Sequence, residues 1–218
     1  MVRVLCLIIG YCFGLIQTSY LYGRLHGIDI RKYGSGNAGT TNALRTLGLK
    51  AGLITLLGDC LKCILAVVVV RLLFGSTHKD MLWLLSMYAA TGTILGHNFP
   101  FYLGFHGGKG IAATAGLIIS TGWQLTLIEI VVFFSVFFIT HYVSLGSLLV
   151  YVVFMIAVVT AGQCGWLNLS GGHLIELYIL ALLLTLLAFW QHRGNIKKLL
   201  QGTERKTYLS KQGKNERE

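Results

Sequence analysis

The sequence predicts an all-α integral membrane protein, a polytopic bundle of helices that cross the bilayer. Of its 218 residues, 55% are apolar and only 12% are charged, whereas about 25% are charged in a typical soluble domain. The mean hydropathy of the chain is +0.69. Several apolar runs approach the roughly 20 residues that a helix needs to cross the hydrocarbon core. Together these observations exclude an ordinary soluble domain.

Four apolar runs predict membrane helices directly. They cover residues 4–23, 51–73, 81–96 and 173–190. The first run follows Arg3 and could be read as a signal peptide, but it has the length of a full span and lacks a small-x-small cleavage pattern. We therefore expect it to be the first membrane helix.

The basic residues predict the orientation of the chain in the membrane. The loop over residues 24–50 carries five Lys or Arg residues and one acidic residue, and the segment from residue 192 onward carries eight Lys or Arg residues and three Glu residues. Basic loops remain on the cytoplasmic side, so we expect the N-terminus outside and the C-terminus in the cytoplasm. Anionic lipids account for the net charge of +10 without nucleic acid as a partner.

The number of helices depends on residues 111–162, which are mostly apolar. An even number of crossings is needed between residues 110 and 192 to keep both basic segments on the same side. Residues 111–162 therefore form either three short helices, giving about seven in all, or one span with re-entrant structure, giving five. Breaks are expected at Gly122-Trp123 and around residues 141–146. We favour seven helices in a single domain over residues 1–204, followed by a flexible basic tail at 205–218.

The first polar segment runs from Gly34 to Arg45. It matches G-x-G-x-x-G, but the dinucleotide fingerprint requires a preceding strand in a βαβ unit, and here the flanks are membrane helices. Glycines let backbone N–H groups approach an anion closely, and Arg45 can bind an oxyanion through two parallel hydrogen bonds. The candidate ligand-binding residues are Gly34, Ser35, Gly36, Asn37, Gly39, Thr40, Thr41 and Asn42.

The second polar segment places Lys109 among Gly107, Gly108 and Gly110, just before a predicted helix. This arrangement suits phosphate binding at a helix start. It is not a Walker A motif, because no Ser or Thr follows the lysine, so nucleotide hydrolysis is not expected. His97, earlier in the same segment, is a candidate hydrogen-bond donor or base.

The third polar segment follows the last membrane helix. His192 and Asn195 are three residues apart and therefore lie on one helical face. Glu204 is the only acidic residue near them, and we expect it to pair with an Arg or Lys and hold the segment in place.

Two ionisable residues, Asp59 and Lys62, fall inside the predicted helix 51–73. Such residues are functional candidates, but a mutually neutralising pair that supports a loop is an equally good interpretation. We assign both a structural role. The Cys60-Leu-Lys-Cys63 spacing lies in the same helix with no second ligand pair, so neither a disulfide nor a metal or other cofactor is predicted.

Taken together, the three segments resemble the PlsY family of bacterial membrane acyltransferases. The family's first motif corresponds to Ser35-Gly-Asn-Ala-Gly39, Asn42 and Arg45. Its second corresponds to Gly96-His97, Phe99, Phe105 and Gly107-Gly-Lys-Gly110, and its third to His192, Asn195-Ile196, Gly202 and Glu204. Cys63 stands where the family usually has Gly, and His106 stands where it commonly has Lys.

The resemblance implies a seven-helix bundle in the bacterial plasma membrane with its active site on the cytoplasmic face. It also implies transfer of an acyl group from acyl phosphate to the 1-hydroxyl of glycerol 3-phosphate, the first step of phospholipid synthesis. The partners would be these two substrates and membrane lipids, and the oligomeric state is left open, with a monomer allowed. No His is followed by Asp five positions later, as the acyl-CoA-dependent enzymes require.

Charge predicts how such a site would work. Two phosphate anions repel each other unless cations and N–H groups offset the repulsion. The expected catalytic residues are Ser35, Arg45, Lys109, His192 and Asn195. We expect direct attack on the activated donor, with Ser35 as a covalent nucleophile being the competing route. The proton acceptor could be His97, His192 or a substrate phosphate oxygen.

Two other function classes fit the sequence less well. A transporter of organic phosphates would place its site near the midplane between internal repeats, whereas the polar segments lie on one side of the membrane and no repeat is evident. An enzyme that moves a phosphoalcohol group would need clustered Asp residues for a metal, and the chain contains only three Asp residues.

Overall fold

The computed structural model describes residues 1–169 and 171–208, and within these residues every regular element is a helix. The α-helices are α1 (Val2–Gly14), α2 (Thr18–Leu25), α3 (Thr40–Leu47), α4 (Leu49–Phe74), α5 (Leu82–Asn98), α6 (Ile111–Thr121), α7 (Trp123–Thr140), α8 (Val143–Gln163), α9 (Gly171–Gln191) and α10 (Arg193–Leu200). Three single 3₁₀ turns cover Ile30–Lys32, Lys79–Met81 and Phe101–Leu103.

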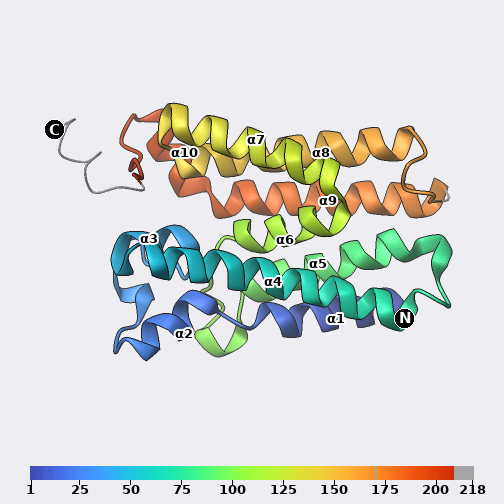
Figure 1. Ribbon diagram of the computed structural model, residues 1–218, viewed down its shortest axis with the longest axis horizontal. Coiled ribbons are helices and arrows are strands. Elements are labelled where there is room, and N and C mark those ends of the chain that lie inside the picture. The colour runs from blue at the N-terminus through green and yellow to red at the C-terminus, as the bar shows by residue number, and fades with distance from the viewer. Residues whose placement is uncertain (170, 209–218) are drawn as a thin grey trace.

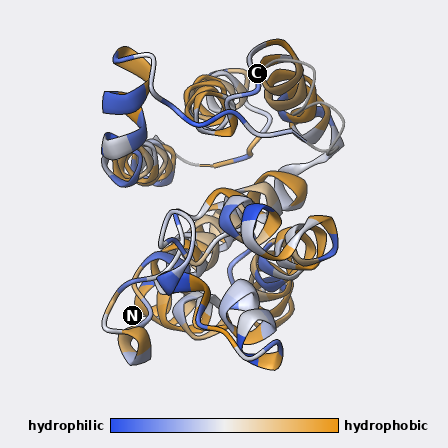
Figure 2. Cartoon of the chain, turned by 90° about the vertical axis from the view of Figure 1, so that its left-hand side faces the viewer, coloured by the Kyte–Doolittle hydropathy of each residue, from blue (hydrophilic) through white to orange (hydrophobic). Residues whose placement is uncertain are grey.

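The helices form two layers with roughly parallel axes (Figure 1). Helices α1 to α5 make one layer, α7 to α10 make the other, and α6 lies between them in contact with α4, α5 and α7. Figure 2 shows the two groups end-on, with hydrophobic residues along most of the helices. The all-helical membrane architecture predicted from the sequence is confirmed.

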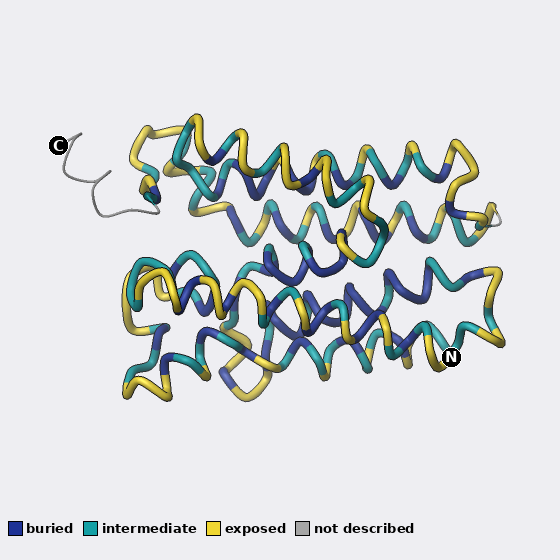
Figure 3. Tube along the Cα trace, viewed as in Figure 1, coloured by how far each residue is buried: buried dark blue, intermediate teal, exposed yellow. Residues whose placement is uncertain are grey.

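Five helical segments in the described residues are long and apolar enough to cross a membrane. They are Val2–Leu25, Leu49–Phe74, Trp123–Thr140, Val143–Gln163 and Gly171–Gln191. Large apolar side chains on their outer faces are exposed, as in Leu57 (67%) and Leu72 (78%). Burial is concentrated on α5 and on the facing sides of the other helices (Figure 3). Apolar side chains that are exposed in this way are expected of a protein surrounded by lipid.

Residues 111–163 contain three helices, interrupted at Gly122 and at His141-Tyr142. Both breaks expected from the sequence are confirmed. Gly122 has φ +145°, a value that favours glycine, and His141 ends α7 in the left-handed conformation with φ +60°. Helices α6 and α7 therefore form a hairpin, and α6 is only 11 residues long.

The prediction of one continuous helix over residues 4–23 is wrong, because α1 ends at Gly14 and α2 begins at Thr18. The break leaves carbonyl groups inside the bundle that need partners. The Lys62 ammonium donates to the carbonyls of Gly14 and Ile16, at 3.3 and 2.6 Å. The Gln17 amide donates to Gly14, at 3.2 Å, and to the end of α5.

Small residues let α1 and α5 approach closely. A Cβ added at Gly10 would lie 2.8 Å from the Ala89 carbonyl carbon, and one added at Gly96 would lie 3.0 Å from Gly14 Cα. Gly10 and Gly14 on α1, with Gly92 and Gly96 on α5, are each spaced by four residues. Contacts of this kind drive helix association in lipid, where apolar burial alone provides little preference. The packing fixes α5, and with it His97 at its end.

Candidate active site

The three polar segments meet around a cavity of about 150 Å³ at the end of the bundle that carries α3 and α10 (Figure 1). The predicted site residues that line it are Ser35, Asn37, Gly39, Thr40, Thr41, Asn42, Arg45, Asp59, His97, Lys109, Gly110, His192, Asn195 and Glu204. Gly34, Gly36, Lys62, Gly107 and Gly108 are not in its wall. The cavity lies between the two layers, so neither layer contains the site alone.

The first loop is shaped by Asn42. Its side-chain oxygen accepts from the backbone N–H of Ser35 at 2.9 Å, and its amide group donates to the carbonyls of Ile30 and Tyr33. Gly34 and Gly36 have φ of +61° and +73°, which the turn requires. Asn42 therefore builds the loop around which a ligand would bind, and its polar atoms are engaged by the backbone.

Two helix starts face the cavity. The first turn of α3 contributes Thr40 and Thr41 to the wall, and the first turn of α6 contributes Ile111 and Ala112. The amides of a first helical turn have no partner within their helix and attract anions. The Thr40 hydroxyl is buried without a hydrogen-bond partner.

The Gly107-Gly108 pair packs against the end of α5. Gly107 N–H donates to the Asn98 carbonyl and Gly108 N–H donates to the His97 carbonyl, each at 3.1 Å. Ala38 N–H donates to the Gly107 carbonyl and joins the two loops. The two glycine amides, expected to face a phosphate, are thus already engaged within the protein. What the glycines provide is close approach, because an added Cβ at Gly108 would lie 2.8 Å from His97 Cε1.

Lys109 reaches across the cavity to α10, where its ammonium donates to the Asn195 side-chain oxygen. The Asn195 amide donates to Glu204 at 2.8 Å, and the Ser144 hydroxyl donates to the same carboxylate oxygen at 2.9 Å. Glu204 therefore bonds to an amide and a hydroxyl, rather than directly to a Lys or Arg as expected. Burial lowers the pKa of Lys109, and the negative charge of Glu204 opposes that shift.

Arg45 is held by residues from the far end of the chain. Its Nη2 donates to the Arg205 carbonyl at 2.9 Å and to the Thr207 hydroxyl at 2.5 Å. Thr207 is 3% exposed and its N–H donates to the His141 carbonyl. Arg45 Nε is buried with no hydrogen-bond partner, so the guanidinium retains donors for a ligand. Residues 205–208 of the predicted tail thus lie against the site, and residues 209–218 lie outside the described residues.

The two site histidines differ in tautomer. His97 Nδ1 lies 2.8 Å from the Lys62 ammonium and must accept, so its hydrogen is on Nε2. His192 Nδ1 lies 2.8 Å from the Ala188 carbonyl and must donate, so its Nε2 is an acceptor when the ring is neutral. Burial and the nearby Lys109 charge lower the pKa of His192 to about 4. At neutral pH His192 is therefore uncharged, with an available ring nitrogen.

Asp59 and Lys62 form a buried ion pair with 2.9 Å between Oδ1 and Nζ. Thr18 also donates to this Asp59 oxygen, at 3.0 Å. Because the same ammonium caps the break between α1 and α2 and orients His97, these contacts favour the supporting interpretation over a direct catalytic one. Asp59 Oδ2 has no hydrogen-bond partner.

Sequence reasoning missed the contribution of α8. Ser144 and Ser147, on its first two turns, are 6% and 1% exposed and line the cavity with Val143. From the sequence alone, the polar interruption around residues 141–146 predicts only a helix break. Nothing in one sequence indicated that this break faces the other three segments.

The profile of the family described as "Glycerol-3-phosphate acyltransferase" matches residues 4–202. The chain belongs to the glycerol-3-phosphate acyltransferase family. A relative from Clostridioides difficile, named glycerol-3-phosphate acyltransferase, is 42% identical over 93% of this chain and 94% of its own length. One of the same name from Thermoanaerobacter is 40% identical over 94% of this chain and 96% of its own length.

Two solved structures of PlsY (YgiH), an integral membrane glycerol 3-phosphate acyltransferase, have the same fold. The glycerol 3-phosphate form has a TM-score of 0.81 at 28% identity and covers 94% of this chain and 96% of its own. The lysophosphatidic acid form has a TM-score of 0.78 at 28% identity and covers 95% and 96%. The family resemblance drawn from the three polar segments is thereby confirmed, as is membership of a membrane acyltransferase family.

Proposed function

We propose that this chain transfers an acyl group from acyl phosphate to the 1-hydroxyl of sn-glycerol 3-phosphate. The products are 1-acyl-glycerol 3-phosphate and inorganic phosphate. The observation that carries the proposal is the convergence of Lys109, Arg45 and two helix starts on one cavity. The solved PlsY structures support it, because they are a glycerol 3-phosphate form and a lysophosphatidic acid form, the acceptor and product of this reaction.

Both substrates are phosphate anions, so the site must first offset their mutual repulsion. Arg45 has an unpaired Nε and a planar set of donors, which suits one phosphate. Lys109 supplies a second positive charge next to the start of α6, suited to the phosphate that leaves. Ser35, Asn37 and Asn195 orient the glycerol phosphate.

In the transfer step the 1-hydroxyl oxygen attacks the carbonyl carbon of the acyl phosphate. The new carbon–oxygen ester bond forms as the bond from that carbon to the phosphate oxygen breaks, and phosphate departs with the bonding electrons. The hydroxyl proton passes to an acceptor. His192 Nε2 and an oxygen of a substrate phosphate are the two candidates, since His97 Nδ1 is engaged by Lys62.

Transfer is direct, without an acyl-enzyme. Acyl phosphate is already activated, so a covalent intermediate would gain little. Ser35, the competing nucleophile, is exposed, and its hydroxyl has no hydrogen bond to a histidine among residues 1–169 and 171–208. A serine nucleophile needs a base within hydrogen-bond reach.

The proposed arrangement in the bacterial plasma membrane has seven helices, counting α1 with α2 as one and adding α4 to α9. The basic loop 24–50 and the segment after α9 lie at one end of the bundle, while Met1 lies at the other (Figure 1). Positive charges favour the cytoplasm for that end, so the N-terminus is outside and the cavity opens on the cytoplasmic face. Residues 1–204 form the acyltransferase domain.

A pair of lysine variants tests the site. Lys109→Ala removes the proposed phosphate partner, whereas Lys50→Ala removes an exposed lysine from the first turn of α4. We expect lysophosphatidic acid formation from labelled glycerol 3-phosphate to fall at least about a hundredfold in Lys109→Ala, because loss of one charged transition-state contact costs roughly 3 kcal/mol. Lys50→Ala should retain the parent rate. Equal rates in the two variants would remove Lys109 from the mechanism.

A further inference from the structure

A second and larger cavity, of about 760 Å³, lies at the opposite end of the bundle. It is bounded by the far halves of α4 and α8, the start of α5, and the turn between α6 and α7. Because α6 ends at Thr121 after 11 residues, the α6–α7 hairpin fills only part of the space between the two layers. The cavity shares no lining residue with the candidate active site.

The wall of this cavity has an apolar part and a polar part. Leu117, Leu125, Phe154 and other aliphatic or aromatic side chains make up most of it. The polar groups come from helix ends and are Arg71, Ser86, Ser120, Thr121, Gln124 and Thr160. An apolar chain with one polar head matches such a wall.

Arg71 is the charged group of the cavity. Its Nε donates to the Ser86 hydroxyl at 3.1 Å and its Nη2 donates to the Ser120 carbonyl at 2.8 Å. Its guanidinium lies over the Trp83 ring, 5.5 Å from the ring centre. No carboxylate among the described residues lies within 4.0 Å of it. A guanidinium has five N–H donors, so this half-buried cation has donors in excess of its protein partners and no counter-charge.

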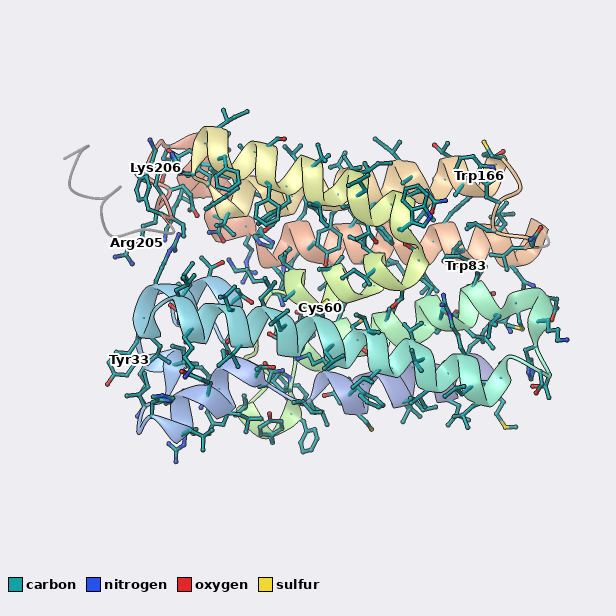
Figure 4. All side chains as sticks on the ribbon, viewed as in Figure 1. Tyr33, Cys60, Trp83, Trp166, Arg205 and Lys206 are labelled. Carbon is teal, nitrogen blue, oxygen red and sulfur yellow. The ribbon has the colours of Figure 1, made fainter. Side chains whose placement is uncertain are left out.

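We propose that this cavity binds an anionic membrane lipid, with its phosphate on Arg71 and an acyl chain along the apolar wall. Arg71 has N–H donors beyond its two protein partners and no carboxylate nearby, and a lipid phosphate supplies both the acceptor oxygens and the missing negative charge. Trp83 and Trp166, both in the wall, lie toward the end of the molecule opposite Arg205 and Lys206 (Figure 4). Tryptophan prefers the headgroup level of a bilayer, so these rings mark the depth at which the lipid phosphate would lie.

The lipid is bulk phospholipid and not the acyl donor. The two cavities have separate walls, and Arg71 is three residues from the end of α4, far along the helix from Asp59 at the first cavity. The proposal is therefore independent of the proposed acyl transfer.

Tryptophan quenching in vesicles tests the proposal. The full-length protein is reconstituted in phosphatidylcholine containing a small mole fraction of phosphatidylglycerol with brominated chains, which quench nearby tryptophans. We expect more quenching than random mixing gives, and no such excess when the brominated lipid is phosphatidylcholine. The excess should be lost in Arg71→Gln, retained in Arg71→Lys, and reduced in Trp83→Phe.

Arg193 provides the matched control, because its guanidinium lies 4.4 Å from the centre of the Trp190 ring at the other end of the bundle. Arg193→Gln should keep the excess quenching. An excess that persists in Arg71→Gln, or that disappears only in Arg193→Gln, would overturn the proposal, as would equal quenching by both lipids in the parent. If palmitoyl phosphate displaces the brominated lipid, the cavity binds the donor chain and the assignment is wrong.

Discussion

Arg45 and Thr207, 162 residues apart in the chain, share a hydrogen bond of 2.5 Å between the guanidinium and the threonine hydroxyl. Thr207 is itself anchored to the His141 carbonyl between α7 and α8. The contact joins the first polar segment to the segment that follows α10. Thr207 lies beyond residue 202, where the match to the family profile ends. Thr207 thus positions a residue that we assign to phosphate binding.

Replacing Thr207 with Val should loosen Arg45 without changing the volume of the side chain. A hydrogen bond to a charged group contributes about 1.5–3 kcal/mol, so we expect kcat/KM for acyl transfer to fall roughly tenfold or more. The loss should lie mainly in KM, and Thr207→Ser should restore it. Thr203 is the control, because its hydroxyl is exposed and makes only a 3.5 Å contact with the Lys198 carbonyl. If Thr203→Val lowers kcat/KM equally, Thr207 has no positioning role.

The tautomers of the two site histidines can be read by ¹⁵N NMR. His192 should be neutral at pH 7 with its hydrogen on Nδ1, and His97 should carry its hydrogen on Nε2. Because the pKa of His192 is lowered to about 4, its ring should remain neutral down to about pH 5 and become charged only as the pH falls through 4. Spectra of His192→Gln and His97→Gln assign the signals. A His192 ring that titrates near pH 6.5 would contradict the assignment of a buried ring that is neutral at pH 7.

Gly108 should tolerate no side chain. Its neighbour is the His97 ring, and an added Cβ would lie 2.8 Å from Cε1, closer than packed atoms approach one another. We expect Gly108→Ala to displace the His97 ring, which lines the cavity and carries an Nε2–H donor, and so to lower kcat at least about tenfold while the protein still folds. Gly172→Ala is the matched change at an open position, with nothing within 4 Å of the added Cβ. Full activity in Gly108→Ala would mean that the position of His97 is not important for the rate.

The absence of an acyl-enzyme can be tested by intact-protein mass spectrometry. The parent protein, mixed with palmitoyl phosphate alone and quenched rapidly, should keep its unmodified mass. Ser35→Ala should lose part of its activity through weaker orientation of glycerol phosphate. A palmitoyl adduct in the parent that is missing from Ser35→Ala would establish the covalent route instead.

Much of the fold was predictable, because apolar length and breaks in apolar runs are local properties of a sequence. The gaps at Gly122 and His141 could be placed in this way. The interruption between α1 and α2 could not, since Gln17 breaks an apolar run only weakly. What stabilises the break is Lys62, a residue from another helix.

The sequence predicted which residues form the candidate site better than it predicted what each residue does. Lys109, Arg45 and Asn195 line one cavity, as the expected placement of the polar segments on one side of the membrane and the family resemblance implied. The roles depend on hydrogen-bond partners far away in the chain, such as Ser144 for Glu204 and Thr207 for Arg45. The role of the glycine motif also differs from the predicted one, because the Gly107 and Gly108 N–H groups donate to carbonyls of the protein instead of facing a phosphate.

The donor assay tests the central claim most directly. Purified protein in detergent is given glycerol 3-phosphate with either palmitoyl phosphate or palmitoyl-CoA, and lysophosphatidic acid and released phosphate are measured. We predict both products in equal amounts from palmitoyl phosphate and none from palmitoyl-CoA, with both lost in Arg45→Ala. Lysophosphatidic acid from palmitoyl-CoA, or none from either donor with uptake of glycerol 3-phosphate into liposomes, would contradict the proposed reaction.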